Sequence, residues 1–191
     1  MTKNIEKNTR GEMECEVAEC RTLFEKKTRD YGTSWRILRL PSLTDQIYIK
    51  ANRIRSVQES GENRVGDGVR GEFVAMVNYA VMGLILIEES GDKELELPIE
   101  DALRLYDKQM KRVLDLMMDK NHDYGEAWRQ MRMSSMVDLI LMKLLRIKQI
   151  ENNEGRTLVS EGVEGGYMDI INYSLFCLVR LTEDEELRMK N

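Results

Sequence analysis

The chain of 191 residues contains one pattern twice, and this tandem duplication limits its fold more than any other feature. Between residues 27 and 54, 13 of 28 positions are identical to the residue found 93 positions later. The segment "TRDYGTSWR" at 28–36 matches "NHDYGEAWR" at 121–129, and Lys-x-x-Arg follows each copy. After a one-residue insertion, "GVRGEFVAMVNYAVMGLIL" matches "GVEGGYMDIINYSLFCLVR". We therefore expect two copies of one structural unit in a single chain.

Each copy has the composition of a helical unit, and it has residues that typically begin and end helices. Only two prolines occur in the chain, whereas Leu, Met, Glu and Lys are abundant, which favours helix. The first helices are expected at 12–29 and 98–121, each ending at Asp-Tyr-Gly, because glycine accepts the left-handed backbone found after a helix. Second helices are expected to begin near Ser42 and Ser135, whose hydroxyls suit an N-cap. Third helices are expected at 69–88 and 163–181.

The apolar third helices predict how the two copies pack. A helix that is apolar nearly all round cannot be covered by two partner helices of its own repeat. We therefore expect an all-α protein of two tandem units, each of three to four helices, packed about a pseudo-twofold axis like the subunits of a dimer. The predicted organisation is a flexible N-terminus at 1–11, repeats at 12–90 and 98–182, a linker at 91–97 and a fraying tail at 183–191.

Charge and hydropathy exclude two classes of partner. The net charge is −5 and the charges are interspersed, so no basic face for direct DNA binding is expected. The polar N-terminus lacks the apolar core of a signal peptide. The most apolar stretch, Phe73 to Ile87, is interpreted as too short and too interrupted to span a bilayer. We expect a soluble, cytoplasmic protein without a membrane partner, and a homo-oligomer remains open.

The repeated Lys-x-x-Arg places two cations on one helical face. Lys143 and Arg146 lie three residues apart within the apolar segment "LILMKLLRI", and Lys50 and Arg53 are their counterparts. Cations beside an apolar surface need anionic partners. Those partners are either carboxylates of the protein or phosphates of a ligand.

Oxygen-bearing side chains of the second repeat share one face if its third helix continues back to residue 161, namely Glu161, Asp169 and Asn172, with Glu164 to one side. If the helix starts after Gly166, the two Glu lie on the entering loop instead. Hard oxygen ligands beside a Lys/Arg pair suit Mg²⁺ bound to a phosphorylated substrate. The alternative is that Asp169 only neutralises Lys143 or Arg146 across the bundle.

The other repeated residues also allow two interpretations. Trp35 and Trp128 are either anchors of the core or rings that stack on a base. The glycine and tyrosine of each Asp-Tyr-Gly are expected to be structural. Asp30 and Asp123 are expected to pair with a cation.

With these motifs assembled, the chain resembles the nucleotide-modification-associated domain 1 family, whose biochemical function is unknown. The resemblance rests on Asp-Tyr-Gly followed by Trp, on Lys-x-x-Arg, and on Asp-x-x-Asn-Tyr, and it covers each repeat once. More distantly, the layout is similar to the MazG-like all-α nucleoside triphosphate pyrophosphohydrolases. Those enzymes use Glu and Asp on helices to hold Mg²⁺ on a nucleoside triphosphate.

The resemblance implies roles for the second repeat, because Ala75 and Arg70 occupy the Asp169 and Glu164 positions of the first. Asp169 and Glu164 would be catalytic. The implied Mg²⁺ ligands are Glu161, Glu164 and Asp169, and the implied nucleotide contacts are Lys143, Arg146, Asn172, Trp128, Lys50 and Arg53. Two functions follow. One is Mg²⁺-dependent hydrolysis of a (deoxy)nucleoside triphosphate to the monophosphate. The other is a non-catalytic protein that kept the fold, either to bind a nucleotide or modified nucleotide or to act as a helical interaction protein.

Overall fold

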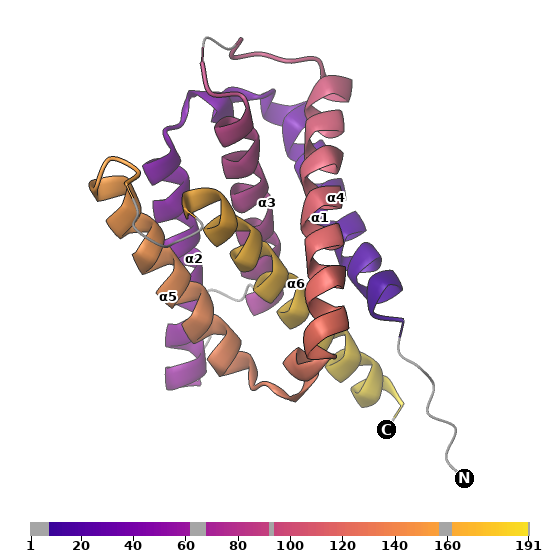
Figure 1. Ribbon diagram of the computed structural model, residues 1–191. Helices are drawn as coiled ribbons and strands as arrows, with labels where there is room; N and C mark the ends of the chain where they lie inside the picture. The colour runs from indigo at the N-terminus through magenta and orange to yellow at the C-terminus, as the bar shows by residue number, and fades with distance from the viewer. Residues whose placement is uncertain (1–7, 62–67, 92–93, 157–161, 191) are drawn as a thin grey trace.

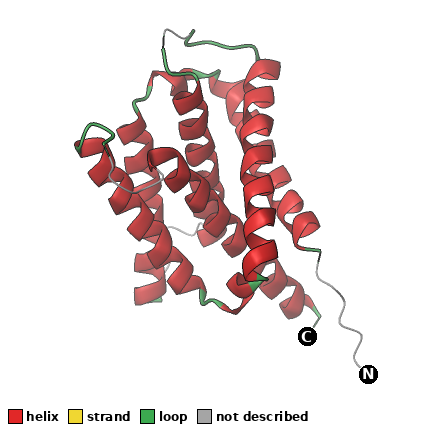
Figure 2. Ribbon diagram, in the orientation of Figure 1, coloured by secondary structure: helices red, strands yellow, loops and turns green. Residues whose placement is uncertain are grey.

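A computed structural model describes residues 8–61, 68–91, 94–156 and 162–190. Within these ranges the secondary structure is helical throughout, and Figure 2 shows helices joined by short loops. The elements are α1 (Thr9–Tyr31), η1 (Ser34–Ile37), α2 (Leu40–Ser60), α3 (Val69–Glu88), α4 (Ile99–Tyr124), η2 (Ala127–Gln130), α5 (Met133–Asn152) and α6 (Gly162–Met189). The predicted all-α fold of two tandem repeats is confirmed.

Matched helices of the two repeats lie side by side. Figure 1 shows three successive layers, with α2 beside α5, α3 beside α6, and α1 beside α4. Within each repeat the second helix packs on the third, so α2 contacts α3 as α5 contacts α6. The first helix of each repeat also contacts the third helix of the other repeat. This exchange is the packing expected of two units about a pseudo-twofold axis.

The apolar helices α3 and α6 form the centre of the core and share the most extensive contact in the molecule. Their close approach requires a glycine, because a Cβ atom on Gly83 would lie 2.7 Å from the ring of Tyr167. The buried Tyr167 hydroxyl also lies 2.7 Å from Thr44 Oγ1 in α2. One side chain of the second repeat thus positions two helices of the first.

The apolar helix α3 has the predicted bounds, Val69–Glu88, but its apolar character extends further than the stretch from Phe73 to Ile87. By length and composition alone, Val69–Glu88 could cross a membrane, which corrects the view that this stretch is too short. In the bundle, however, 67% of its apolar window is buried inside the protein. That burial is the environment of a helix in the core of a bundle.

Helix boundaries differ from the sequence prediction at two places. The second helices begin earlier, so Ser42 and Ser135 lie within the first turn, and the N-cap residues are Arg39 and Arg132 without a side-chain cap bond. The tail predicted to fray at 183–191 is helical as far as Met189. Its helix is held to the body by the side chains described below.

The repeated Asp-Tyr-Gly ends the first helix of each repeat. Gly32 has φ 64° and ψ −153°, and Gly125 has φ 60° and ψ −162°. The positive φ agrees with the prediction, but ψ is extended rather than left-handed helical. This backbone region is almost exclusive to glycine. The chain thereby turns sharply from α1 or α4 into the short helix that carries the tryptophan.

Candidate functional site

The repeated motif lines one pocket in each repeat. We call them the first-repeat pocket, with a volume of about 470 Å³, and the second-repeat pocket, with a volume of about 420 Å³. Twelve matched repeat positions line both pockets. Six of them carry the same residue: Lys27, Tyr31, Gly32, Trp35, Asn78 and Tyr79 in the first, and Lys120, Tyr124, Gly125, Trp128, Asn172 and Tyr173 in the second. Each copy of the repeated motif therefore forms an equivalent pocket in its own repeat.

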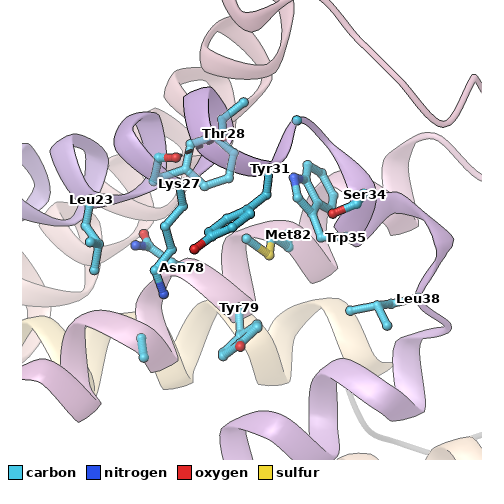
Figure 3. Close-up of a pocket in the computed structure, with 13 residues that line it drawn as sticks. Leu23, Lys27, Thr28, Tyr31, Ser34, Trp35, Leu38, Asn78, Tyr79 and Met82 are labelled. Atoms are coloured by element: carbon cyan, nitrogen blue, oxygen red, sulfur yellow. Dashed lines mark hydrogen bonds between the residues drawn. The ribbon is translucent and has the colours of Figure 1, made fainter.

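Each pocket lies between the end of a first helix and the middle of a third. Figure 3 shows Lys27 and Tyr31 extending from α1 over the first-repeat pocket, with Asn78 and Tyr79 coming from α3. The tyrosine was expected to be structural, and this is wrong, because Tyr31 is 70% exposed and its counterpart is 78% exposed. Helix termination leaves these rings at the pocket rims, where a ligand can contact them.

The aspartates of the motif do not play the expected role. Asp30 is exposed and makes no ion pair with any residue that the structure describes. Asp123 is 74% exposed and contacts the neighbouring His122 at 3.3 Å. Among the described residues, therefore, no Lys or Arg side chain holds either aspartate.

Trp128 is an anchor of the core. Its ring is 5% exposed and stacks on Phe176 with a centroid separation of 4.5 Å, while Arg129 Cζ lies 4.3 Å from the ring centroid. With Phe176 and Arg129 this close to the ring, no room remains for a base to stack on it. Its buried Nε1–H has no hydrogen-bond partner among the described residues, and the same holds for Trp35. Each pocket is therefore lined by a tryptophan whose buried indole donor has no partner among the described residues.

The two pocket asparagines differ in their partners. Asn78 donates to the Cys20 carbonyl at 3.0 Å and accepts from the Tyr106 hydroxyl at 2.9 Å. Asn172 is 5% exposed, and its Oδ1 has no partner in the described part of the chain. The cause is visible in the repeat, because Met13 of α1 occupies the position that Tyr106 occupies in α4. A thioether cannot donate the hydrogen bond that a phenol donates.

A carboxylate held between two lysines forms one end of the second-repeat pocket. Asp169 is 12% exposed and lies 2.9 Å from Lys120 Nζ and 2.5 Å from Lys143 Nζ. Burial raises the pKa of Asp169, but the hydrogen bonds from Lys143 and Lys120 outweigh it and leave the pKa below its ordinary value. Asp169 is therefore ionised at neutral pH, and the three groups carry a net charge of about +1.

The first repeat also has an ion pair at its Lys-x-x-Arg, but this pair lies outside the first-repeat pocket. Lys50 and Arg53 both pair with Glu72, which precedes Ala75 by about one helical turn. Ala75 occupies the Asp169 position, so the first-repeat pocket has no carboxylate there.

The structure gathers only some of the predicted site residues. Lys143, Asp169, Asn172 and Trp128 line the second-repeat pocket, as predicted for a shared site. Arg146 is exposed outside the pocket lining, and Lys50 and Arg53 lie outside the first-repeat lining. Glu164 pairs with Arg112 at 2.6 Å.

The carboxylates described by the structure do not match a magnesium site. Within the described ranges, no three His, Cys, Asp or Glu side chains gather to hold a metal ion. Asp169 and Glu164 are each engaged by cations. The third predicted ligand, Glu161, lies outside the described residues, so the complete Mg²⁺ set stays a prediction.

Sequence reasoning missed the role of the arginine that follows each tryptophan. Arg36 pairs with Glu89 at 2.5 Å, and Arg129 pairs with Glu183 at 2.9 Å. Glu89 and Glu183 are themselves matched positions of the repeat, so the pair is duplicated. Each arginine ties the pocket loop to the C-terminal part of the third helix. The repeated Trp-Arg was the available signal, and Lys120 was likewise visible as the repeat of Lys27.

Comparison with known proteins places this geometry in a family. The family model of nucleotide modification associated domain 1 matches the chain twice, at residues 27–87 and 120–181. These two matches cover well over half of the chain and contain nearly all of the residues that line the two pockets. No curated protein and no solved structure matches the chain. The protein belongs to the nucleotide modification associated domain 1 family.

Proposed function

We propose that this protein binds a nucleotide in the second-repeat pocket. The description of its family points to a process that involves nucleotides. The pocket offers what such a ligand needs, since aromatic rings and lysine side chains line the same pocket. Its volume of about 420 Å³ is within the range of small-ligand sites.

One observation carries the proposal: two buried polar atoms of this pocket have no partner among the described residues. They are the Trp128 Nε1–H donor and the Asn172 Oδ1 acceptor. A buried polar atom without a partner costs about 1–3 kcal/mol. A ligand that presents an acceptor and a donor would remove this cost, and the edge of a nucleobase presents both.

The remaining groups set the orientation of the ligand. The phosphates would lie at the Asp169 end, where Lys120 and Lys143 supply positive charge. Because both faces of Trp128 are occupied, the base would pack against Tyr124 and Tyr173 instead. Asp169 keeps the two lysines in place and can accept a hydrogen bond from a ribose hydroxyl or a base amine.

Mg²⁺-dependent pyrophosphohydrolysis is the second candidate function. It is favoured by the ionised carboxylate of Asp169 inside the pocket. Its metal set depends on Glu161, and the two described carboxylates are already engaged by cations, so no reaction step is assigned to a metal here.

The two tryptophans provide a direct test, because each pocket contains one of them. In ¹⁵N-labelled protein, their two indole N–H signals are assigned with Trp35→Phe and Trp128→Phe. We expect nucleoside mono- and triphosphates, canonical and base-modified, to shift the Trp128 signal saturably. Lys143→Met should weaken binding at least about fivefold, the value of a partly exposed charge contact.

Lys50→Met is the matched control, since Lys50 is the repeat counterpart of Lys143 but lies outside a pocket lining. It should leave the affinity unchanged. Absence of any Trp128 shift across the panel would overturn the proposal. Release of pyrophosphate from a triphosphate with Mg²⁺, lost in Asp169→Asn, would establish the second candidate, and binding without release would reject it.

A further inference from the structure

We infer that the first-repeat pocket is a second, separate ligand site, and that it takes an aromatic carboxylate rather than a nucleotide. The repeat gives both pockets the same lining positions, but three differences change the chemistry of the first. This inference concerns different residues from those of the proposed nucleotide site.

The first change leaves a cation without a carboxylate. Lys27 corresponds to Lys120, but Ala75 stands where Asp169 pairs with Lys120. Figure 3 shows Lys27 reaching from α1 over the pocket, and its amine makes no ion pair or hydrogen bond with the residues that the structure describes. A lysine at the mouth of an apolar hollow attracts an anionic ligand.

The second change removes the acceptor that could recognise a base. Both polar atoms of Asn78 are used, by the Cys20 carbonyl and the Tyr106 hydroxyl. Thr28 donates its hydroxyl to the Phe24 carbonyl of its own helix at 2.9 Å. Among the described lining residues, the buried polar side-chain atom left without a partner is the Trp35 Nε1–H. A donor and a cation together suit a carboxylate, which has only acceptors.

The third change concerns the number of charges. Lys50 and Arg53, which could have added positive charge, are held by Glu72 outside the pocket lining. One lysine balances one negative charge, so a monoanion fits better than a phosphate dianion. The rest of the lining is largely apolar, with Leu23, Leu38, Tyr79 and Met82 around a volume of about 470 Å³. That space accepts the ring of an aromatic acid.

The test uses 3-phenylpropionate and its neutral amide on the full-length protein. We expect 3-phenylpropionate to shift the Trp35 indole N–H signal saturably while the Trp128 signal stays in place. The neutral amide should bind about fivefold more weakly, the upper range for an exposed ion pair. Lys27→Met should abolish the preference for the acid over the amide.

Two matched variants localise the effect. Ala75→Asp gives Lys27 the partner that Asp169 gives Lys120, so it should remove the preference for the acid while the amide still binds. Lys120→Met, the counterpart change in the other pocket, should leave binding of the acid unchanged. A preference that survives Lys27→Met, or is lost only in Lys120→Met, would overturn the site. Adenosine 5′-monophosphate that bound through Lys27 more tightly than the acid would overturn the ligand class, whatever occurs at Trp128.

Discussion

Asp169 lies between two lysine amines, which are also the groups that bind a phosphate in many nucleotide sites. Its carboxylate lies within 3 Å of two lysine nitrogens, on a helix whose neighbouring side chains are mostly apolar. The sequence left open the alternative that Asp169 only neutralises Lys143. In the structure Asp169 does pair with Lys143, and it also lines the second-repeat pocket. The same side chain can hold the lysines and contact a ligand.

The depressed pKa of Asp169 predicts a pH-dependent contribution to stability. Because the folded-state pKa lies below the ordinary value of 3.8, the contribution is present above that value and is lost as pH falls through the folded-state pKa. Asp169→Asn should lower the free energy of unfolding by about 1–3 kcal/mol at pH 7, and the difference from wild type should shrink below pH 4. Urea denaturation at both pH values measures it.

Asp45→Asn is the control for that measurement. Asp45 pairs with Lys148 at 2.6 Å, but its side chain is 61% exposed, so its loss should cost well under about 1 kcal/mol. Equal costs for the two substitutions would mean that burial does not strengthen the Asp169 pairs.

The difference between the two asparagines marks the limit of prediction from sequence. Asn78 and Asn172 occupy matched positions and look equivalent in the repeat. Their chemistry diverges because the hydroxyl that satisfies Asn78 comes from Tyr106, in the other repeat. The partner of a buried amide depends on which helix crosses it, and a local motif does not encode that crossing. Lys143 was predictable because it repeats as Lys50, and Asp169 because it is a carboxylate within an otherwise apolar segment.

The helices themselves were well predicted, and their ends less so. Apolar periodicity and glycine placed all six α-helices, but the second helices start two residues before the serines expected to cap them. In α2, Pro41 lies in the first turn, where its missing N–H costs nothing and its fixed φ favours the start. Local steric preference therefore outweighed the capping hydroxyl.

The glycine that ends α4 allows a test of backbone conformation alone. A Cβ on Gly125 would meet nothing within 4 Å, so Gly125→Ala adds no clash. Its φ of 60° and ψ of −162° nonetheless lie where other residues are strained, so we expect a loss of about 1–3 kcal/mol in unfolding free energy. Gly61, with φ 68° and ψ 2°, has the left-handed backbone that asparagine tolerates. Gly61→Asn should therefore change the melting temperature little, and a similar loss in both variants would contradict the assignment.

The molecule as a whole was foreseen as two repeats about a pseudo-twofold axis, and the layered pairing of matched helices agrees. The interface between α3 and α6 is the centre of the core rather than a seam between two domains. We therefore expect the repeats to unfold together. In urea, tryptophan fluorescence of Trp35→Phe reports the second repeat and that of Trp128→Phe reports the first. Far-ultraviolet circular dichroism follows the helices of the whole molecule in the same variants. Within each variant, the urea midpoint from fluorescence should equal the urea midpoint from circular dichroism. Separate midpoints within one variant would show that the repeats are independent.

The contact of Gly83 with Tyr167 has no counterpart in which the two repeats exchange roles, so it makes the interface between them asymmetric. In a symmetric dimer, the same surface is used by both subunits, so every contact across the interface would occur twice. Here the position matched to Gly83 is Cys177, and the position matched to Tyr167 is Phe73. A pair of second repeats would press a cysteine side chain into each tyrosine ring, where the fused chain offers only a hydrogen atom. Joining the halves allowed their facing surfaces to differ, and two copies of the second repeat could no longer approach each other this closely.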